Sequence, residues 1–576
     1  MSAVEPGSRR RLATAAILLF ALGWARPYFP AINNPNENVR LYMTAAIVEE
    51  GRYAIDSMRA RWGWVNDAAI HHGHVFSVKA PGTSLLGVPA YALYYGWCRL
   101  RDVPIDREVA LWACRLAASM VPMVLFGLLL VRSLGRDATD PVARDAVAFG
   151  VLSGSAMYGY SLLFVSHATA GAAGFTAFHL LARARALGHA SRWRAFAAGL
   201  CAAGVTAFEY PGLLVSVLLC VQALGSIRPW HRLLPFALGG AIPTAAVMHF
   251  QWVAFGDPLT PGHRFVETDA FRAIHHEGLY GATALRGEAL FGLLLDPGYG
   301  LVPTSPLLVL AAPGFVLWMR RRGRRLEAMV AAACVLLTVL AIGSMTHWRG
   351  GWTVGPRYLV PVLPFAAWLA LGALDAMCRR WRWLGHAIAL GGLLAGLIAS
   401  ALPSVYYPHV PPEIARPLRD LIPILVAHDY APWTVLHPFG VTGTAAMLPL
   451  FAGLVALVLW IGWRRRPSIA AHVRVAVGAL GVSTAALAVQ ALPADCDRAC
   501  RDAVAFVTRH WHPPGHDRAS RLSRALEAAP EPDFDGYRRL AALYTAEGRD
   551  AEARMALQRM AIRARRASGE SAESAR

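Results

Sequence analysis

The stretch LATAAILLFALGWARPYF (12–29) is followed closely by NPNENVRLY (34–42), and this junction sets the interpretation of the chain. An apolar run of roughly 20 residues crosses a bilayer as a helix. The polar segment after it places one carboxylate, Glu37, between two amides and close to Arg40. Because the run has no small-residue cleavage site, we expect a retained anchor rather than a removed signal peptide.

The composition of the whole chain indicates many such helices. Of the 576 residues, 56% are hydrophobic and 16% are charged, whereas soluble domains carry about 25% charged residues. The apolar runs are too long and too uniform for barrel strands. We predict an all-α polytopic membrane protein with about 13 transmembrane helices. The candidate spans are residues 12–30, 109–131, 145–165, 168–183, 194–208, 210–226, 233–255, 301–319, 327–345, 357–377, 384–402, 445–463 and 469–490.

The net charge of +19 comes from arginine clusters at the ends of apolar runs. They are RRR (9–11), RRRGRR (320–325), RRWR (379–382) and RRR (464–466). Basic loops stay in the cytoplasm. The arginine clusters all lie on one side of the membrane only if the apolar run 80–97 does not cross it. We therefore expect 80–97 to lie in the membrane interface, the N-terminus in the cytoplasm and the C-terminus outside. This pattern accounts for the charge, so no nucleic-acid partner is expected.

This topology divides the chain into two predicted domains. Residues 1–490 form the transmembrane domain, with a first outer loop at 31–108, and residues 491–576 form a helical tail outside the membrane. The segment 535–564 resembles a single tetratricopeptide-type hairpin, which is too short to stack as a solenoid alone. Cys496 and Cys500 share one helical face, so a local disulfide is an option there.

The outward loops hold the residues that could carry chemistry. A carboxylate can take a proton from a hydroxyl, and cations can neutralise a departing phosphate. In the first outer loop these residues are Glu37, Arg40, Asp67 and Lys79, and in later loops they are His167, Glu209, His263, Arg264 and Arg357. Simpler alternatives stay open. Glu37 could cap a helix, and Arg357 could extend its charged end to the membrane–water interface without any role in the chemistry.

Three histidines in the first outer loop invite a metal interpretation. His71, His72 and His74, with Asp67, could in principle bind zinc. However, the helical HxxxH or HxxH spacing is absent, and HHGH fits a flexible loop equally well. We expect no resident cofactor, with a divalent metal still compatible with the sequence.

Taken together, several short segments resemble the GT-C superfamily of membrane glycosyltransferases, such as protein O-mannosyltransferases and lipid A aminoarabinose transferases. The resemblance covers about residues 30–465. Its segments are NPNENVRLY (34–42), FSVKAPGTSLLGVPAY (76–91), GDPLTPGH (256–263), LLLDPGYGLVPTSPLLVLAAPG (293–314) and GGWTVGPRYLVPVLPF (350–365).

The resemblance implies an inverting glycosyltransferase in a bacterial inner membrane. It would move a sugar from a polyprenyl-phosphate donor to an acceptor hydroxyl on the outer face. Glu37 would be the general base, and Lys79, Arg357 and Arg40 would lie near the donor phosphate. Many members have Asp, or an Asp-Glu pair, where this chain has a single acid, so the base assignment stays open.

Two other classes of function compete with this interpretation. A transporter or flippase for lipid-linked sugars would also need many spans, but it would be expected to show inverted repeats with broken helices, and no such halves are evident. An inactive GT-C-like scaffold is the other alternative, because the first loop offers only one acid at the expected point. The sequence does not identify the sugar or the acceptor.

Overall fold

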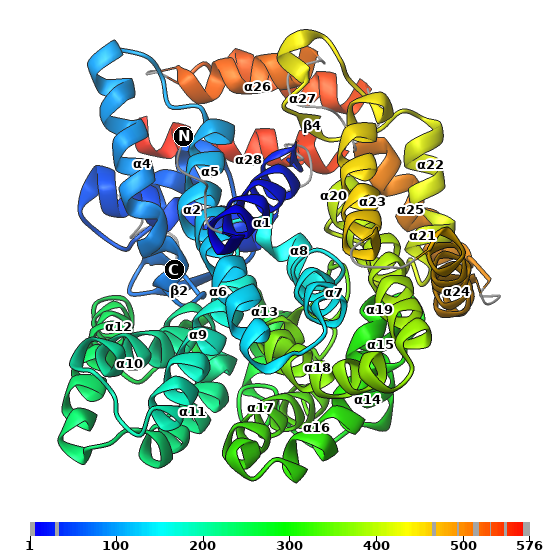
Figure 1. Cartoon of the computed structure of the whole chain (residues 1–576). Helices are drawn as coiled ribbons and strands as arrows, with labels where there is room; N and C mark the ends of the chain where they lie inside the picture. Colours follow the sequence, from blue (N-terminus) through cyan, green and yellow to red (C-terminus); the bar gives the residue numbers. More distant parts are fainter. Residues whose placement is uncertain are drawn as a thin grey trace.

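The computed structural model describes residues 6–28, 34–463, 468–491, 495–510, 518–529, 532–546 and 550–567. Most of these residues are helical (Figure 1), and their strands form two small two-stranded sheets. Seven of the described helices are long and apolar enough to cross a membrane. The chain is thus an all-α polytopic membrane protein, as predicted. The arginines 464–466 and Gly548 lie outside the described residues.

Every predicted span overlaps a helix, although the number that crosses the membrane stays a prediction. The span at 145–165 is interrupted, because α7 ends at Leu152 and α8 at Ser161. The helices of this bundle are α1 (Pro6–Gly23), α5 (Arg107–Arg115), η1 (Leu116–Met120), α6 (Val121–Asp137), α7 (Pro141–Leu152), α8 (Ala156–Ser161), α9 (His167–Ala186), α10 (Arg192–Phe208), η2 (Tyr210–Gly212), α11 (Leu213–Ser226), η3 (Trp230–Arg232), α12 (Leu233–Phe255), η5 (Pro306–Leu310), α16 (Ala311–Arg320), η6 (Arg322–Arg324), α17 (Arg325–Gly343), η7 (Arg357–Val362), α18 (Leu363–Arg380), α19 (Arg382–Gly396), η8 (Leu397–Ala401), α20 (Leu402–Tyr406), η10 (Thr444–Met447), α23 (Leu448–Trp463), α24 (Ile469–Ala488) and η11 (Val489–Ala491).

The first outer loop folds around a hydrophobic core of its own. Its elements are α2 (Pro35–Glu50), α3 (Asp56–Trp62), β2 (Ala68–His71), β3 (His74–Ser77) and α4 (Gly82–Arg101). The core includes the buried side chains of Tyr42, Trp62, Val65 and Tyr91. Because this loop is packed rather than extended, it can hold charged side chains in fixed positions.

The later outer loops are shorter and mostly irregular. Their elements are η4 (Gly262–Phe265), α13 (Asp269–His276), α14 (Gly287–Leu294), α15 (Leu301–Thr304), α21 (Pro417–Asp420), α22 (Ile422–Ala427) and η9 (His437–Phe439). Strand β4 (Trp433–Thr434) pairs antiparallel with β1 (Ala25–Arg26), so the 403–444 loop is tied to the end of the first helix.

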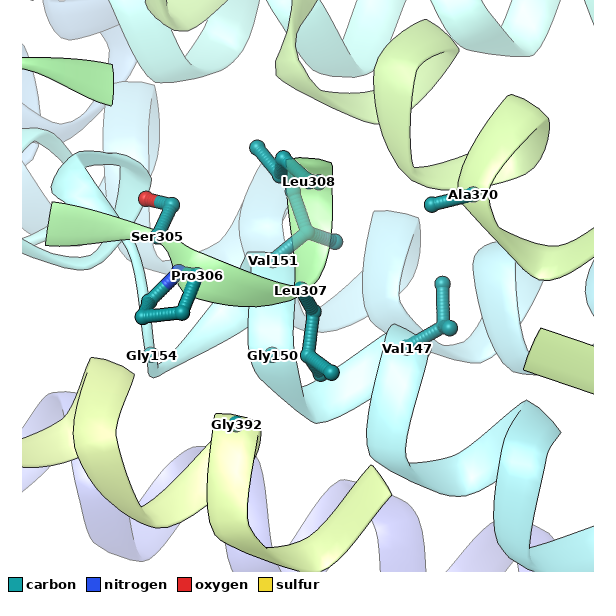
Figure 2. Close-up of a pocket in the computed structure, with 10 residues that line it drawn as sticks. All are labelled: Val147, Gly150, Val151, Gly154, Ser305, Pro306, Leu307, Leu308, Ala370 and Gly392. Carbon is teal, nitrogen blue, oxygen red and sulfur yellow. The ribbon is translucent and has the colours of Figure 1, made fainter. Parts of the chain in front are cut away.

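The motif 293–314 enters the core of the bundle rather than lining an open cleft. Figure 2 shows Ser305, Pro306 and Leu307 beside Gly150 of α7 and Gly392 of α19. The crevice between them leaves only about 10 Å³ for the centre of a water molecule, barely enough for one water. We therefore interpret residues 305–308 of this motif as packing residues.

The tail forms a separate small core against the first outer loop. Its helices are α25 (Arg498–His510), α26 (Arg518–Ala528), α27 (Phe534–Ala546) and α28 (Asp550–Ala567). Helix α28, red in Figure 1, lies beside the blue helices of the first outer loop and contacts α3, whereas Val507 of α25 packs into the core of the bundle. Cys496 and Cys500 are disulfide-bonded. The domain boundaries and the tetratricopeptide likeness stay predictions.

One arginine joins the tail to the first outer loop. Arg559 Nη2 lies 3.0 Å from Glu527 Oε1, with both side chains nearly fully buried. The same nitrogen donates to the carbonyl oxygen of Arg61 at the end of α3, at 3.3 Å. A buried pair that loses one partner leaves an uncompensated charge behind.

Arg559→Ala should therefore release the tail. We expect a loss of about 3–5 kcal/mol in the stability of the docked tail. Cleavage of the tail by proteinase K should become at least roughly 150-fold faster if the open fraction sets the rate. Arg554→Ala, on an exposed position of the same helix, is the control. Equal cleavage of both variants would mean that Arg559 does not hold the tail in place.

Candidate functional site

The first outer loop brings Asp67 and Lys79 together at the open end of its β-hairpin. Strands β2 and β3 pair with Ala68 opposite Ser77, so the residues just outside the strands become neighbours. The carbonyl oxygen of Asp67 accepts a hydrogen bond from the N–H of Val78, and Lys79 Nζ lies 3.1 Å from Asp67 Oδ2. The Asp67 side chain is still 26% exposed, which leaves it open to a substrate.

Three cations from separate elements act on the Asp67 carboxyl. Burial by itself raises the pKa of Asp67, but Lys79, Arg357 and Arg40 outweigh burial and hold that pKa below its usual range. The carboxyl is therefore ionised at neutral pH. These three cations are the ones that the sequence predicts near a donor phosphate, and the structure brings them to one place.

Arg40 links α2 to the loops before α9 and after α10. It is 1% exposed, and its Nη2 donates to Ser166 Oγ at 2.8 Å and lies 3.9 Å from Glu209 Oε2. The Ser166 hydroxyl donates to the same Glu209 oxygen, and His167 Nδ1 lies 3.0 Å from it. Because Glu209 and Ser166 already engage it, Arg40 acts on the site mainly through its charge.

Glu209 is an ionised member of this group. Burial acts to raise the pKa of Glu209, but His167, Arg40 and the Ser166 hydroxyl outweigh it and keep that pKa well below the usual range. Its side chain is 15% exposed. Of the two carboxylates Glu209 and Asp67, Glu209 is thus the more enclosed and Asp67 the more accessible.

Arg357 enters the region from the start of η7 and keeps one unused donor. Its guanidinium lies over the Tyr358 ring, with Cζ 4.9 Å from the ring centroid, and Nη2 donates to Tyr358 Oη at 3.2 Å. In the part of the chain that the structure describes, buried Arg357 Nε has no hydrogen-bond partner. Gly350 (φ +76°) leaves the necessary space, because a Cβ there would lie 2.6 Å from that Nε. The guanidinium as a whole carries the charge that suits an anion such as phosphate.

Glu37 lies deeper than these residues and is held by four hydrogen bonds. It is 2% exposed. Arg115 donates from Nε and Nη2 to its two oxygens at 2.8 and 2.7 Å. The backbone N–H of Phe164 donates to Oε1, and Asn34 Nδ2 donates to Oε2 at 3.0 Å. Asn34 Nδ2 also lies 3.0 Å from His409 Nε2.

These contacts favour the charged form of Glu37. Burial alone raises the pKa of Glu37, yet the ion pair and hydrogen bonds of Arg115 outweigh burial and lower it. A carboxylate with both oxygens engaged has little capacity left to accept a substrate proton. The role of Glu37 as general base stays a prediction, and its contacts are those of a residue that positions α2.

A shell of histidines surrounds the cation group. The ring centroids of His263 and His275 are 4.8 Å apart, and His347 is near enough for Arg357 and Lys79 to affect its pKa. Burial, then the charge of Lys79, lowers the pKa of His263 to about 3. Burial, then Arg357, lowers the pKa of His347 to about 4. Both rings are therefore neutral at pH 7, where each can offer one donor and one acceptor.

The remaining predicted residues lie apart from this group. Arg264 is exposed. His72 and Gly73 both have positive φ, 48° and 78°, as a two-residue hairpin turn requires. His71 and His74 flank this turn, and His74 Nδ1 faces Asp56 Oδ2 at 3.4 Å. The HHGH segment thus forms a hairpin turn.

Sequence reasoning missed several residues that complete the site. These are Arg115, Ser166, His275 and His409. A signal was present for one of them, because Arg115 is a charged residue inside a predicted apolar span, and such residues generally have a partner. Hydroxyls and histidines in loops carry no comparable pattern, so only the tertiary contacts reveal the others.

Two side-chain groupings of the described residues bring three possible metal ligands within 4.8 Å of one another, and neither is in the cation group. They are Asp140 with Cys378 and His386, and Asp420 with Cys496 and Cys500. In the second grouping the disulfide uses both cysteines. The absence of a cofactor at the cation group stays a prediction.

Comparison with known proteins gives similarity of structure only. No family model and no curated protein matches the sequence. The fold is similar to apo ArnT from Cupriavidus metallidurans, with TM-score 0.46 and 18% identity over 87% of this chain and 78% of that one. It is also similar to AglB from Archaeoglobus fulgidus, with TM-score 0.42 and 13% identity over 70% of this chain and 56% of that one. A third similar structure is EmbB from Mycobacterium smegmatis, with TM-score 0.41 and 15% identity over 85% of this chain and 41% of that one.

AglB is described as an archaeal oligosaccharyltransferase and EmbB as an arabinosyltransferase. The ArnT protein is also described bound to undecaprenyl phosphate, and AglB is in complex with a dolichol-phosphate. This chain spans less than half the length of EmbB. Because the likeness is one of overall shape, the function proposed next rests on the side chains of the site.

Proposed function

We propose that the protein is an inverting membrane glycosyltransferase that uses a polyprenyl-phosphate sugar donor at the outer face. The observation that carries the proposal is the accessible Asp67 carboxylate surrounded by Lys79, Arg357 and Arg40. A phosphate leaving group needs cations, and an acceptor hydroxyl needs a base within reach. The site offers both at the end of apolar helices, where a lipid-linked donor would present its headgroup.

In the proposed reaction, the acceptor oxygen attacks the anomeric carbon of the donor sugar. The bond from that carbon to the phosphate oxygen breaks, and the phosphate leaves with the electron pair. Lys79 and Arg357 bind the phosphate as its charge develops. Asp67 takes the proton of the acceptor hydroxyl. Glu37, locked by Arg115, holds α2 and therefore Arg40 in place.

Donor binding itself tunes the base. In the free protein, Lys79 pairs with Asp67 and lowers its pKa. A bound phosphate shares Lys79 and Arg357, so their effect on the carboxyl weakens and the pKa of Asp67 rises. A higher pKa makes the carboxylate a better proton acceptor. The base thus becomes effective when the donor is in place.

Lys79→Met should shift the pH dependence of transfer. With Lys79 present, the acid limb of kcat/KM should lie below the ordinary aspartate pKa of about 3.9. Removing the cation raises the pKa of Asp67, so the limb should move to higher pH and KM for the donor should increase. Arg264→Met, a cation on an exposed position, is the control. If the acid limb of kcat/KM lies at the same pH in Lys79→Met as in the wild type, Lys79 does not lower the pKa of the catalytic base.

The direct test of the function is transfer from defined donors. Purified full-length protein is mixed with radiolabelled polyprenyl-phosphate sugars and a membrane extract as the acceptor source. Label should move from the lipid to an acceptor and should require intact Asp67. If no donor supports transfer, while vesicles containing the protein move the lipid-linked sugar across the bilayer, the transporter interpretation is correct instead.

A further inference from the structure

A second cluster of chemistry-bearing side chains lies at the opposite end of the bundle. Asp140 stands before α7, Cys378 is near the end of α18, and His386 is in the first turns of α19. The chain runs from Asp140 through α7 and α8 to Ser166, and from Arg357 through α18 to Cys378. The cluster is therefore separated from the cation group by the length of these helices.

Each ligand atom of this cluster is already close to the others. One carboxylate oxygen, the thiol sulfur and one ring nitrogen lie within 4.8 Å of one another. Asp140 Oδ2 is 3.0 Å from His386 Nε2. Zinc bonds to O, N and S are about 2.0–2.3 Å long, so tetrahedral ligands are roughly 3.3–3.7 Å apart. Ligand atoms at the 4.8 Å limit would have to approach by about 1 Å, and the Asp140–His386 pair would have to open by a few tenths of an ångström.

The local fold builds this geometry. Asp140 Oδ1 caps α7 by accepting from the N–H groups of Val142 and Ala143, at 2.8 and 3.0 Å, which leaves Oδ2 to face His386. At Gly385, α19 crosses against Cys378, because a Cβ at Gly385 would lie 2.6 Å from the Cys378 Cα. A larger residue there would push His386 away from the thiol.

Packing explains only part of this arrangement. The bond between Asp140 and His386 alone would tie α7 to α19. It does not account for the free Cys378 thiol, which is 2% exposed and lies within 4.8 Å of both ligand atoms. Carboxylate, imidazole and thiolate together are a ligand set for a borderline-soft divalent ion such as zinc.

We propose that Asp140, Cys378 and His386 form a binding site for Zn²⁺ or a similar divalent transition-metal ion. On binding, the Cys378 thiol gives its proton to solvent, and its sulfur bonds the ion. The ion with one thiolate, one carboxylate and one neutral imidazole has no net charge, which suits a buried site. The fourth position is left to water. The ion would fix the starts of α7 and α19 to the end of α18.

The test uses the full chain in detergent, stripped with a chelator and titrated with Co²⁺ alone. We expect about one equivalent to bind with a thiolate-to-cobalt charge-transfer band, and Zn²⁺ to displace it. Cys378→Ser should abolish the band, and His386→Gln should weaken Co²⁺ binding by at least roughly 100-fold. Cys334→Ser, a buried free cysteine outside the grouping, should keep the band.

Two outcomes would overturn the proposal. One is a wild-type protein that shows no thiolate band at saturating Co²⁺, and this measurement needs no variant to fold. The other is a band of equal strength in Cys378→Ser. Because the readout is metal binding rather than sugar transfer, its failure would leave the proposed glycosyltransferase function unaffected.

Discussion

Asp67→Asn should reduce kcat/KM for sugar transfer by about 10²–10⁴-fold while leaving the fold intact. The loss follows from removal of the proton acceptor, for which this range is typical. Asparagine keeps the shape of the side chain, and the Asp67–Lys79 pair is partly exposed, so such a pair contributes only about 0–1 kcal/mol to stability. Transfer from the best radiolabelled donor and thermal unfolding would be measured on the same preparation.

The matched control for this variant is Asp269→Asn. Asp269 begins α13 in another outer loop and is 94% exposed, so it should lose neither activity nor stability. Donor binding by Asp67→Asn should persist, because Lys79 and Arg357 remain. If Asp67→Asn transfers sugar at the wild-type rate, the base lies elsewhere, and Glu209 is the next accessible carboxylate.

Glu37→Gln should reduce the free energy of unfolding by about 3–5 kcal/mol, because it leaves the buried Arg115 charge without its partner. Both side chains are nearly fully buried, 2% and 3% exposed, so solvent cannot compensate. Thermal unfolding in detergent would show the loss as a lower Tm. Glu288→Gln, at an exposed glutamate, should change stability by less than about 0.5 kcal/mol.

The double variant Glu37→Met with Arg115→Leu sharpens this experiment. Replacing both charges by apolar groups removes the unpaired buried charge, so the double variant should be more stable than either single variant. If Glu37 is instead the general base, Glu37→Gln will keep its Tm and lose transfer activity. The two variants Asp67→Asn and Glu37→Gln therefore separate catalysis from positioning.

Acid should destabilise the protein through the Glu37–Arg115 pair, as the Glu37→Gln substitution does. The pKa of Glu37 is lower in the folded protein than in the unfolded chain, so the folded state favours the charged form. The stability from this pair is fully present above the unfolded value of about 4.3 and is lost as pH falls through the folded pKa. In Glu37→Gln this component of acid sensitivity should be absent.

Much of the fold could be predicted from the sequence because bilayer spans have a local signature. A run of about 20 apolar residues is helical wherever it lies, and every predicted span overlaps a helix. The β-hairpin before Lys79 was not predicted, although His72-Gly73 occupies its turn. Its four-residue strands are too short for a clear alternation, and histidine at positive φ is an uncommon turn residue.

The sequence named most residues of the candidate site but not the role that each one has in the proposed reaction. Lys79, Arg40 and Arg357 were expected near a phosphate, and the structure gathers them around Asp67. Glu37 was expected to be the base because it follows the first span. Its accessibility depends on Arg115, 78 residues away, and on the N–H of Phe164, 127 residues away, and neither contact has a local pattern.

The sequence by itself determined the helical class, the positions of the apolar helices and the residues that supply charge in the loops between them. These properties follow from local composition, because hydrophobic length and arginine clustering act segment by segment. Only the tertiary structure decided which carboxylate is locked and which is open, and that Asp140, Cys378 and His386 meet. Burial and hydrogen bonding are set by partners distant in the chain, and they control whether an acid is structural or reactive.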